Sequence, residues 1–533
     1  MRARRTKAAV QPTERVEPGL QRNCPREHNT RDLDCDWGPN MRLRYVGAVV
    51  TVVGLVTVGC SASKQAPAAS TQAEMGPAGA KPGEPRQADL LKGSYRFDRN
   101  GWTFVHLEGT PQQVGFQHGY QLSAEIEDLL RVAAPFLEKT SKRDWAFYRE
   151  AAEKILWPGV DEEYRAEIDG IVAGLTAKGV KADRWDVVAL NGIEELPDYY
   201  VPWLDRQKGK EPQTKAPGNC SAFVATGDWT KDRKIVIGHN AWTNYIVGER
   251  WSIIFDIKPA KGHRILMDGL PGVITSADDF GVNDAGIAVT ETTITGFEGF
   301  DPKGTPYFYR SRKALQYAES IDDYVKTMVD RNNGGYANDW LLGDNKTGEI
   351  ALFELGLKTW TVDKTKNGYF VGANFPNKPT LTKEETTFDV ANKASSPNAR
   401  HARWEQLMAT HKGTIDAEVG KAFEGDKYDV ILKKDGPTER SLCGAVEDSP
   451  RGVPEWTWAA YFPGGTVQAK VMDSTMIGKL EMWAAMGRPC TGDFKADAHL
   501  AKHAEFGWMK GLLRDMPSQP WTRFAAGMAE GSK

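Results

Sequence analysis

The sequence has few cysteines and lacks the spacings that usually mark a metal site. Its six cysteines are dispersed as Cys24, Cys35, Cys60, Cys220, Cys443 and Cys490. No two of them form a C-x-x-C pair, and the nine histidines include no H-E-x-x-H spacing. Structural zinc sites and helical zinc-hydrolase sites usually carry such spacings. We therefore expect no required metal and no cofactor.

The chain also lacks an excess of either charge. Sixty-eight Lys and Arg residues face 71 Asp and Glu residues, which gives a net charge of −3. A polyanionic partner such as nucleic acid needs a strongly basic surface, so no nucleic-acid partner is expected. With 533 residues, 40% of them hydrophobic and 26% charged, the chain has the composition of a globular protein of one large or two smaller domains.

A long apolar run is also missing, and the one short run lies near the N-terminus. Residues 1–40 are polar and without periodicity, which indicates disorder or a start codon assigned too far upstream. After Met41, two arginines precede an apolar run over 46–58, and Gly59 follows this run. Because this run is shorter than the ~20 residues that span a bilayer, 41–60 is predicted to be a secretory signal.

The end of this signal, Gly59-Cys60, resembles a bacterial lipoprotein signal, in which Cys60 is lipidated and becomes the mature N-terminus. Thr57 departs from that pattern, so ordinary signal-peptide cleavage and an uncleaved anchor remain alternatives. Residues 61–95 are rich in Ala, Pro, Gly and Ser and are predicted to form a flexible tether. The protein is thus expected to be exported to the bacterial cell envelope, either anchored to the membrane through Cys60 or free in the periplasm or medium.

Two regions with different periodicity follow the tether. After a strand over 96–109, residues 96–219 show mainly helical periodicity, with His118 on an apolar helix face, where a hydrogen-bonded core histidine is typical. Residues 220–533 alternate strand, turn and strand, with FGVNDAG and GDNKTGE as hairpin connectors. Helices are expected over 310–332 and over 397–413, the latter with Ser396 as its N-cap. The pattern predicts an α+β protein whose sheets are covered by helices.

The most informative stretch is GNCSAFVATGDWTKDRKIVIGHNAWTNY, residues 218–245. A lone cysteine, Cys220, precedes a predicted strand, a turn and a returning strand that carries His239 and Trp242. The polar loop over 208–218 is predicted to be exposed and easily cut. If the chain is cut between Asn219 and Cys220, the new α-amine, with a pKa of about 7.7–8.0, can deprotonate the thiol of its own residue. The alternative is that Cys220 is a small core residue.

This stretch resembles the nucleophile region of the phospholipase B-like family, whose members are N-terminal-nucleophile hydrolases. VGFQHGYQLSAEI, VVALNGIEEL, YANDWLLGDNKTGEIALFELG and GYFVGANFP are similar to other segments of the family, in the same order, over about 109–404. The segment GHNAW is similar to the phospholipase B-like family. The related acyl-coenzyme A:isopenicillin N acyltransferase family has a segment similar to GQNWD at the same place. The resemblance implies a four-layer αββα sandwich, a helical fragment 96–219 and a catalytic fragment 220–533 that begins with the nucleophile.

The resemblance also implies roles for particular residues. Asn374 in VGANF matches the asparagine of the superfamily near the nucleophile and is the leading oxyanion donor, with Asn338 as a weaker one. Each of these two could instead cap a turn or a strand end. His239 is expected to orient the α-amine or to bind the acyl carbonyl, unless it is structural. Trp242 would form a wall of the substrate pocket or, alternatively, part of the core.

Arg400 and Arg403 lie three residues apart on one helical face. The helix dipole disfavours a cation in the first turn, where Arg400 falls. An acidic partner or an anionic group of the substrate would offset this cost, so both arginines are predicted to bind substrate, with solvent exposure as the alternative.

These features together predict an autoproteolytically activated enzyme, a cysteine hydrolase that cleaves acyl ester or amide bonds. The family name suggests phospholipid as the substrate, and an acyl-lipid or acyl-amide small molecule is the expected partner. The alternatives are a non-catalytic surface lipoprotein that binds a ligand, and an amidase or acyltransferase acting on N-acyl amides or peptides. Cys443 and Cys490 are predicted to form a disulfide because export favours oxidation.

Overall fold

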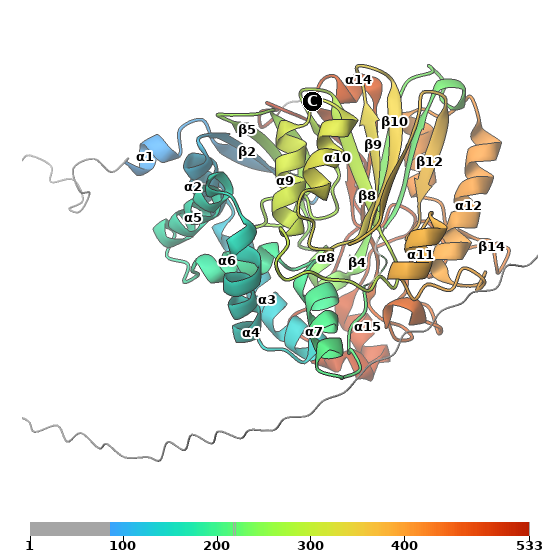
Figure 1. Ribbon diagram of the computed structural model, residues 1–533, viewed down its shortest axis with the longest axis horizontal. Helices are drawn as coiled ribbons and strands as arrows, with labels where there is room; N and C mark the ends of the chain where they lie inside the picture. Colours follow the sequence, from blue (N-terminus) through green and yellow to red (C-terminus); the bar gives the residue numbers. More distant parts are fainter. Residues whose placement is uncertain (1–85, 217, 219, 532–533) are drawn as a thin grey trace, which may run out of the picture. The chain divides into compact units, whose positions relative to one another are not determined.

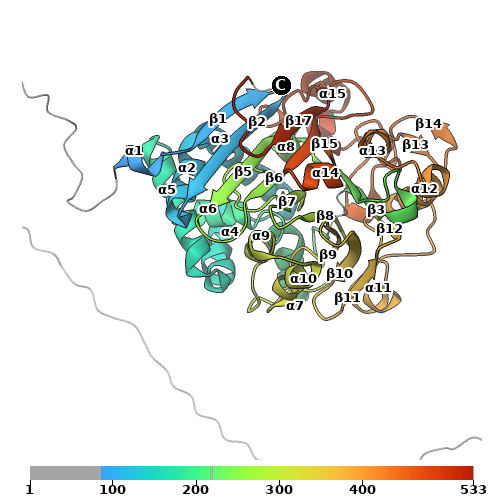
Figure 2. The same ribbon diagram turned by 90° about the horizontal axis from the view of Figure 1, so that it is seen from above.

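Two β-sheets form the centre of the protein. The computed structural model describes residues 86–216, 218 and 220–531. Nine strands form the larger sheet in the order β1-β2-β5-β6-β7-β8-β9-β10-β11, and six form the smaller one in the order β12-β3-β4-β15-β16-β17. Neighbouring strands pair antiparallel except β2 and β5, which are parallel. Figure 2 shows the two sheets edge-on.

The strands are short and mostly buried. Those of the larger sheet are β1 (Tyr95–Arg99), β2 (Trp102–Gly109), β5 (Ile253–Pro259), β6 (Ile265–Gly269), β7 (Gly281–Asn283), β8 (Ile287–Thr293), β9 (Asn338–Asp344), β10 (Glu349–Leu355) and β11 (Trp360–Thr365). Those of the smaller sheet are β12 (Gly368–Gly372), β3 (Ser221–Thr226), β4 (Val236–Asn244), β15 (Gly464–Asp473), β16 (Glu481–Met486) and β17 (Thr522–Ala525). A separate two-stranded sheet pairs β13 (Tyr428–Asp429) with β14 (Lys434–Asp435).

Alternation of side chains along the strands gives each sheet two apolar faces. Ile254 of β5 and Leu341 of β9 share a core with Val224 of β3, so this core lies between the two sheets. Phe255 and Leu342, their neighbours along the chain, belong to a second core that the helices cover. Because successive residues of a strand point to opposite faces, a strand buried on both faces is apolar throughout.

Helices cover both sheets (Figure 1). The helices of the first half are α1 (Gln87–Leu90), α2 (Pro111–Gln121), α3 (Ser123–Ser141), α4 (Trp145–Ala151), α5 (Glu162–Ala177), α6 (Arg184–Asn191), α7 (Val201–Gln207) and α8 (Tyr245–Gly248). Those of the second half are α9 (Tyr307–Tyr317), α10 (Ile321–Val329), α11 (Pro379–Glu385), α12 (Ser396–His411), α13 (Ala417–Glu424), α14 (Ser474–Ile477) and α15 (Ala496–Lys502). Single turns of π-helix or 3-10 helix span Ala152–Leu156, Trp157–Gly159, Leu196–Tyr200, Gly227–Trp229, Pro454–Trp456 and Ala504–Met509.

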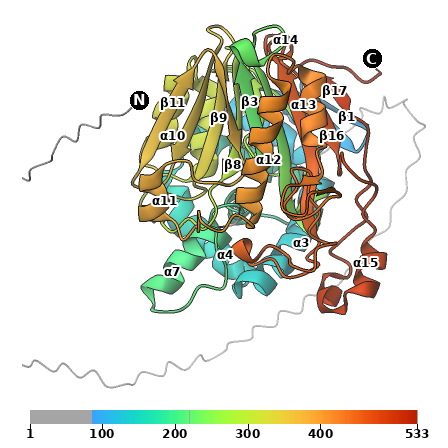
Figure 3. The same cartoon turned by 90° about the vertical axis from the view of Figure 1, so that its right-hand side faces the viewer.

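The helices divide between the two sheets. α2 contacts β2, and α9 and α10 contact β7, β9 and β10, all in the larger sheet. α12 and α13 contact β12, β4 and β15 of the smaller sheet, and Figure 3 shows them in front of its strands. The predicted α+β class, with sheets covered by helices, is therefore confirmed.

α2 and α5 cross with unusually close backbones. A Cβ atom placed on Gly115 would lie 1.8 Å from the carbonyl oxygen of Glu167, and one placed on Gly119 would lie 2.1 Å from that of Ile171. Gly174 of α5 is crowded in the same way by the backbone of α2. Only glycine fits at these positions, because any side chain would force the two helices apart.

Four local predictions were wrong in detail. The single helix expected over 310–332 is divided into α9 and α10, because the chain leaves the helical conformation at Ala318. The helical periodicity of the sequence predicts a single helix over 110–139, but this helix breaks at Leu122, so that α2 and α3 are separate. The strand expected over 96–109 is a hairpin of β1 and β2, with Asn100 and Gly101 at φ of 48° and 79° in the turn. The N-cap of α12 is Ser395, whose hydroxyl accepts a hydrogen bond from the backbone N–H of Asn398, and not Ser396.

Several predictions concern residues that the structure describes only in part or not at all. Residues 1–60, including Cys60, lie outside the described residues, as does Asn219. α1 lies within the stretch expected to be a tether, and its Leu90 carbonyl accepts a hydrogen bond from Gln117. Among the described residues, we find no helix with the length and hydrophobicity needed to cross a bilayer. Cys443 and Cys490 form a disulfide, as predicted.

Candidate functional site

Cys220 directly precedes β3, a strand in the interior of the smaller sheet. β3 pairs with β12 on one side and with β4 on the other, and the Cys220 side chain is buried. Its φ of 105° lies in a region that residues other than glycine rarely adopt. The chain is therefore strained immediately after the predicted cleavage site, a feature that often marks functional sites.

Gly218 brings the chain close to several side chains just before Cys220. A Cβ atom at Gly218 would lie 2.6 Å from Asn374 Cβ, 2.6 Å from Thr295 Oγ1 and 2.7 Å from Trp456 Cε2. A larger residue would clash with all three, which explains why glycine occurs two residues before the cysteine. This contact also places Asn374 beside the predicted cleavage site.

Arg400 holds the backbone of the candidate nucleophile. Its Nη1 donates to the carbonyl oxygen of Cys220 at 2.5 Å and to Ser221 Oγ at 2.9 Å, and its Nη2 donates to Asn374 Oδ1 at 2.6 Å. The guanidinium also lies 4.8 Å from the centre of the Trp242 ring. Arg400 is fully buried, and burial lowers its pKa to about 9. The alternative of a solvated surface arginine is therefore wrong for Arg400.

The hydrogen bonds of Asn374 determine the orientation of its amide. Asn374 Oδ1 accepts a hydrogen bond from Arg400, so the other amide atom is the NH₂ group, Nδ2. Nδ2 donates a hydrogen bond to the carbonyl oxygen of Thr293 at 2.8 Å. Asn374 has a φ of 63°, which asparagine tolerates better than most residues. Asn338 is the first residue of β9 and pairs with Thr293 of β8. The buried side-chain amide of Asn338 makes no hydrogen bond among the described residues.

His239 of β4 and Glu291 of β8 complete a buried cluster with Cys220. One ligand-type atom from each of the three residues lies within 4.8 Å of the others. Cys220 Sγ is 3.9 Å from Glu291 Oε1, which also accepts a hydrogen bond from the Tyr336 hydroxyl at 2.8 Å. His239 Nδ1 lies 3.5 Å from Asp278 Oδ2. The structure thus places His239 beside Cys220.

Burial disfavours charge on all three members of this cluster. It raises the pKa of Cys220 well above its ordinary value, and the nearby carboxyl groups of Glu291 and Asp278 raise it further. Burial likewise raises the pKa of Glu291, and it lowers the pKa of His239 to about 3 with a further contribution from Lys470. In the uncut chain, burial therefore favours the neutral forms of the thiol, the carboxyl and the imidazole.

A charged network supports the cluster from behind. Lys470 of β15 is completely buried and contacts Asp268 Oδ2 at 2.8 Å and Asp278 Oδ2 at 2.5 Å. Burial alone would raise the pKa of Asp278, but Lys470 and His239 lower it below its ordinary value. Asp278 is thus held as a carboxylate next to the His239 ring.

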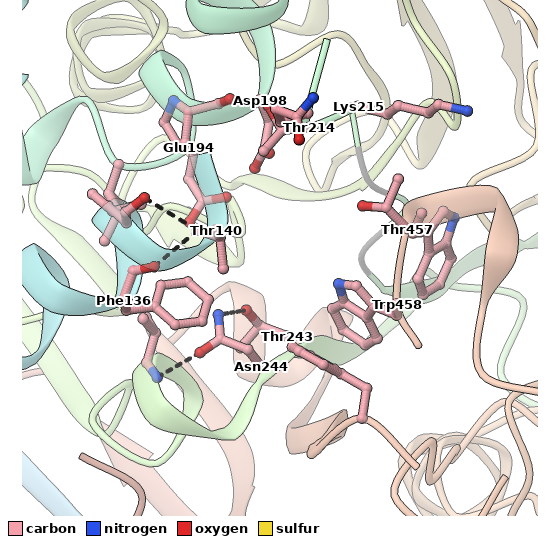
Figure 4. Close-up of a pocket in the computed structure, with 17 residues that line it drawn as sticks. Phe136, Thr140, Glu194, Asp198, Thr214, Lys215, Thr243, Asn244, Thr457 and Trp458 are labelled. Carbon is pink, nitrogen blue, oxygen red and sulfur yellow. Dashed lines mark hydrogen bonds between the residues drawn. The ribbon is translucent and has the colours of Figure 1, made fainter. Parts of the chain in front are cut away.

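A cavity of about 260 Å³ lies beside this region (Figure 4). Its lining residues are Phe136, Leu137, Thr140, Ile193, Glu194, Pro197, Asp198, Gln213, Thr214, Lys215, Thr243, Asn244, Val247, Trp456, Thr457, Trp458 and Phe462. Thr243 and Asn244 continue β4 beyond His239, and Trp456 contacts Gly218, so the cavity adjoins the predicted cleavage site. Residues 213–215 of the preceding loop form part of its wall.

The cavity combines aromatic walls with two carboxyl groups. Burial raises the pKa of Glu194 to about 8, with Asp198 and Asp278 contributing, and it raises the pKa of Asp198 to about 7. Figure 4 shows both side chains on the same side of the cavity as Thr214. At neutral pH these groups can therefore exchange protons with a bound molecule.

Two residues predicted to bind substrate have other contacts. Arg403 pairs with Asp426 at 2.6 Å and lies over the Tyr428 ring, away from Arg400's contacts with Cys220. Trp242 is buried and donates from Nε1 to the carbonyl oxygen of Leu442 at 2.9 Å. Its ring packs edge-to-face against Trp456, which is the indole that lines the cavity at this point.

The loop before Cys220 is only partly as predicted. Residues 208–211 are exposed, as expected for a segment that is easily cut. Thr214, Ala216 and Gly218 are buried, because the chain here packs against the cavity and the sheet. The prediction that the whole segment is exposed is therefore wrong for Thr214, Ala216 and Gly218, whereas Gln213 and Lys215 between them are exposed.

Sequence reasoning missed the acidic residues of the site. Glu194 and Asp198 lie in LNGIEELPDYY, Glu291 in VTETTI, and Asp278 in SADDF. Their shared signal is a carboxylate within an otherwise apolar or small-residue segment, where burial without a partner is costly. That signal indicates a special environment but does not say which distant residues meet there.

Comparisons with known proteins agree on one family. Residues 128–356 match the sequence model of the phospholipase B family. The chain is 22% identical over 369 residues to phospholipase B of Crotalus adamanteus, covering 61% of this chain and 64% of that protein. It is 27% identical over 272 residues to an uncharacterized protein of Archaeoglobus fulgidus (46% and 42%) and 24% identical over 198 residues to phospholipase B-like 1 of Bos taurus (34% and 36%). The matches thus span less than two thirds of each relative's length.

Proposed function

The chain belongs to the phospholipase B-like family, and on this basis we propose that it is a hydrolase of acyl ester or amide bonds that cuts itself between Asn219 and Cys220. The observation that carries the proposal is the position of Cys220. It lies strained and buried at the start of β3, its carbonyl is bound by Arg400, and Gly218, two residues before it, contacts Trp456 in the wall of the cavity. We assign the two facing sheets with their helices to the four-layer N-terminal-nucleophile type.

Self-cleavage requires the thiol of Cys220 to attack the carbonyl carbon of Asn219. A C–S bond forms, the C–N bond breaks, and the thiol proton passes to the departing nitrogen, which becomes the α-amine of Cys220. Water then hydrolyses the thioester, which releases the Asn219 carboxylate and regenerates the thiol. The strained φ of Cys220 favours this step, because the restraint on that backbone ends when the peptide bond breaks.

In turnover, the new α-amine accepts the thiol proton and the thiolate attacks the acyl carbonyl of the substrate. The carbonyl oxygen becomes an oxyanion, for which the Nδ2 group of Asn374 is the proposed donor. A preorganised donor of this kind contributes about 2.7–4 kcal/mol to transition-state stabilisation. Arg400 fixes this amide by binding Oδ1, and so acts on the reaction by positioning Asn374. The alcohol or amine leaves with the proton, and water then releases the acyl group.

The proposed binding site for the substrate is the cavity. Its apolar and aromatic residues, such as Phe136, Val247 and Phe462, suit an acyl chain, and its carboxyl groups suit a polar head. In the uncut chain residues 213–215 form part of its wall. Cleavage frees the end of this segment, so its withdrawal would widen the path to Cys220.

The decisive experiment is to purify the full chain, separate it under denaturing conditions and sequence the N-termini of all fragments. We expect a fragment that begins CSAFVAT, and we expect Cys220→Ala to remain uncut. Arg403→Ala is the matched control and should be cut like the wild type, because Arg403 pairs with Asp426 rather than with the Cys220 backbone. A folded wild-type chain that stays uncut would refute self-cleavage and favour a non-catalytic binding protein.

A second experiment identifies the substrate class. The cut protein is incubated with phosphatidylcholine vesicles, a lysophospholipid and an N-acyl amide, and the release of free fatty acid is measured for each. We expect release from the phospholipids that is absent in Cys220→Ala. Release from the amide alone would overturn the phospholipid assignment and favour an amidase.

We further propose that the protein is exported and anchored through a lipid on Cys60. The Cys443–Cys490 disulfide supports export, because disulfides persist mainly in oxidising compartments. Mass spectrometry of the mature N-terminal peptide tests this proposal. A lipid-modified peptide beginning at Cys60 is expected, whereas an unmodified N-terminus at another residue would refute the anchor.

A further inference from the structure

The side chains of Cys220, His239 and Glu291 come from distant parts of the sequence and meet in one buried place. Their ligand-type atoms lie within 4.8 Å of one another, and each side chain is fully buried. A tetrahedral zinc ion with bonds of about 2.0–2.3 Å would place such atoms roughly 3.3–3.7 Å apart. Shifts of about 1 Å or less would bring the three atoms to a common metal.

Two of these residues carry buried polar atoms that lack a hydrogen-bond partner among the described residues. Neither ring nitrogen of His239 makes a hydrogen bond, and neither does Glu291 Oε2. A buried polar atom without a partner costs about 1–3 kcal/mol, so such atoms mark places where a ligand is missing. Here they occur on the same two residues that could bind a metal together with the thiol.

The surroundings also resemble the outer shell of a metal site. His239 Nδ1 faces Asp278 Oδ2 at 3.5 Å, and Asp278 is held by Lys470. A histidine that binds a metal through one nitrogen usually donates from the other to a carboxylate, which fixes the ring and increases its basicity. His239 is thus arranged to use Nε2 as the ligand.

We propose that Cys220, His239 and Glu291 form a zinc-binding site, and that zinc bound there blocks the proposed nucleophile. The thiolate, imidazole and carboxylate set favours Zn²⁺ over Mg²⁺ or Ca²⁺, which prefer oxygen ligands only. On binding, the Cys220 thiol and the Glu291 carboxyl each release a proton to solvent, and sulfur–zinc and oxygen–zinc bonds form. The two anionic ligands balance the charge of the ion. The inhibitory consequence rests on the proposed function, but the binding site does not.

The test uses Co²⁺ as a spectroscopic substitute for Zn²⁺ on the full chain, freed of metal by a chelator. We expect one equivalent of Co²⁺ to produce a thiolate-to-cobalt charge-transfer band, displaced by Zn²⁺, with release of about two protons, one from the thiol and one from the carboxyl. Cys220→Ala should lose the band, and Glu291→Gln, which is nearly isosteric, should bind at least tenfold more weakly. His263→Ala, at a partly exposed histidine that pairs with Asp284, is the control and should bind like the wild type.

The outcomes separate binding from function. No band with the folded wild-type chain, or a band that persists in Cys220→Ala, overturns the zinc site. Folding of each variant is checked by its unfolding temperature, which Zn²⁺ should raise in the wild type but not in Cys220→Ala. A band in a chain that never cuts itself would support the zinc site while refuting self-cleavage. Self-cleavage of a chain that shows no charge-transfer band would support self-cleavage while refuting the zinc site. If the chain both binds zinc and cuts itself, Zn²⁺ should slow self-cleavage and a chelator should restore its rate.

Discussion

At the scale of single residues, Arg400 and Arg403 lie one helical turn apart and have different roles. Arg400 is fully buried and binds two oxygens of the strand start together with Asn374 Oδ1. Arg403 is about a fifth exposed in its side chain and pairs with Asp426. The two arginines therefore provide a matched pair that separates a contact to the site from an ordinary ion pair.

We expect Arg400→Ala to lower the free energy of unfolding by about 3 kcal/mol or more, because it leaves buried acceptors on Cys220, Ser221 and Asn374 without a donor. Arg403→Ala should cost about 1 kcal/mol. Both are measured by urea unfolding in the Cys220→Ala background, so that cleavage does not alter the chain. If Arg403→Ala lowered the free energy of unfolding by as much as Arg400→Ala or by more, the assignment of different roles to the two arginines would be contradicted.

The carboxyl groups of Glu194 and Asp198 predict a pH dependence of stability. Their pKa values are about 8 and about 7 in the folded protein, against 4.5 and 3.8 ordinarily. Between those limits the unfolded chain binds fewer protons than the folded one, so the free energy of unfolding falls as pH rises. The stabilisation is complete below about pH 4 and is lost as pH rises through about 7 to 8.

The measurement compares wild type with the double variant Glu194→Gln, Asp198→Asn by urea unfolding at pH 5 and pH 8. The wild type should lose more stability than the variant over this interval, by roughly 5–6 kcal/mol, because each unit of pKa shift corresponds to about 1.4 kcal/mol. Glu418→Gln is the control, since its carboxylate is 74% exposed. Identical slopes for wild type and double variant would show that the two groups titrate normally.

The sequence could predict some residues of the site and not others. Cys220, His239 and Asn374 were found because each lies in a segment whose local pattern or family resemblance is recognisable. Glu291 was missed, since its importance comes from β8 passing near the start of β3, and no spacing in the sequence encodes that meeting. The prediction that Arg400 would need an offsetting partner was sound in its physics. Its contacts, however, include a backbone carbonyl, which sequence cannot identify.

At the scale of elements, α2 and α5 show how glycine, a residue of low helix propensity, can stabilise the packing of two helices. Glycine inside a helix costs about 1 kcal/mol relative to alanine. Gly119 nevertheless lies where a Cβ atom would meet the carbonyl oxygen of Ile171 at 2.1 Å. The close contact between the two helices therefore outweighs the lower helix propensity.

We expect Gly119→Ala to destabilise the protein by about 1–3 kcal/mol, because the helices must separate to admit the methyl group. Gly507→Ala is the matched control, since a Cβ atom there would have no neighbouring atom within 4 Å. That variant should change stability by less than about 0.5 kcal/mol or should be slightly stabilising. Thermal unfolding of both variants provides the measurement. A neutral Gly119→Ala would mean that the helices do not pack this closely.

The elements themselves were predictable where local chemistry decides them. The β7–β8 and β9–β10 hairpins were recognised from their turn residues, and the structure confirms both. The break at Leu122 was missed, because residues 110–139 continue the helical period across it and carry neither Gly nor Pro at the junction. The hairpin of β1 and β2 was missed although Asn100-Gly101 is a strong turn signal and residues 98–101 interrupt the apolar alternation.

At the scale of the whole molecule, strand order follows from long-range packing rather than from local pattern. β2 lies beside β5, although paired positions such as Thr103 and Ile253 are 150 residues apart in the sequence. The sequence predicted helices and hairpins but not that β1 and β2 would join a sheet made mainly by the second half of the chain. The predicted division at residue 219 therefore separates two fragments that share one sheet and one core.

This shared core predicts that the two fragments stay together after the chain is cut. Val105 and Leu129 from the first fragment pack in the same core as Phe255 and Met267 from the second. Burying each such side chain contributes about 1.5–3 kcal/mol, so separation would expose far more apolar surface than one peptide bond can restrain.

Brief treatment of the Cys220→Ala variant with trypsin tests this without relying on self-cleavage. Lys208 and Lys210 are exposed in the loop before the site, so cutting should occur there first. The products should elute together in size-exclusion chromatography under native conditions and separate only in denaturant. Fragments that elute apart under native conditions would show that each half folds alone, contrary to the parallel pairing of β2 with β5. The same association would keep the proposed nucleophile, Cys220, in one molecule with the cavity residues Glu194 and Asp198, which the other fragment supplies.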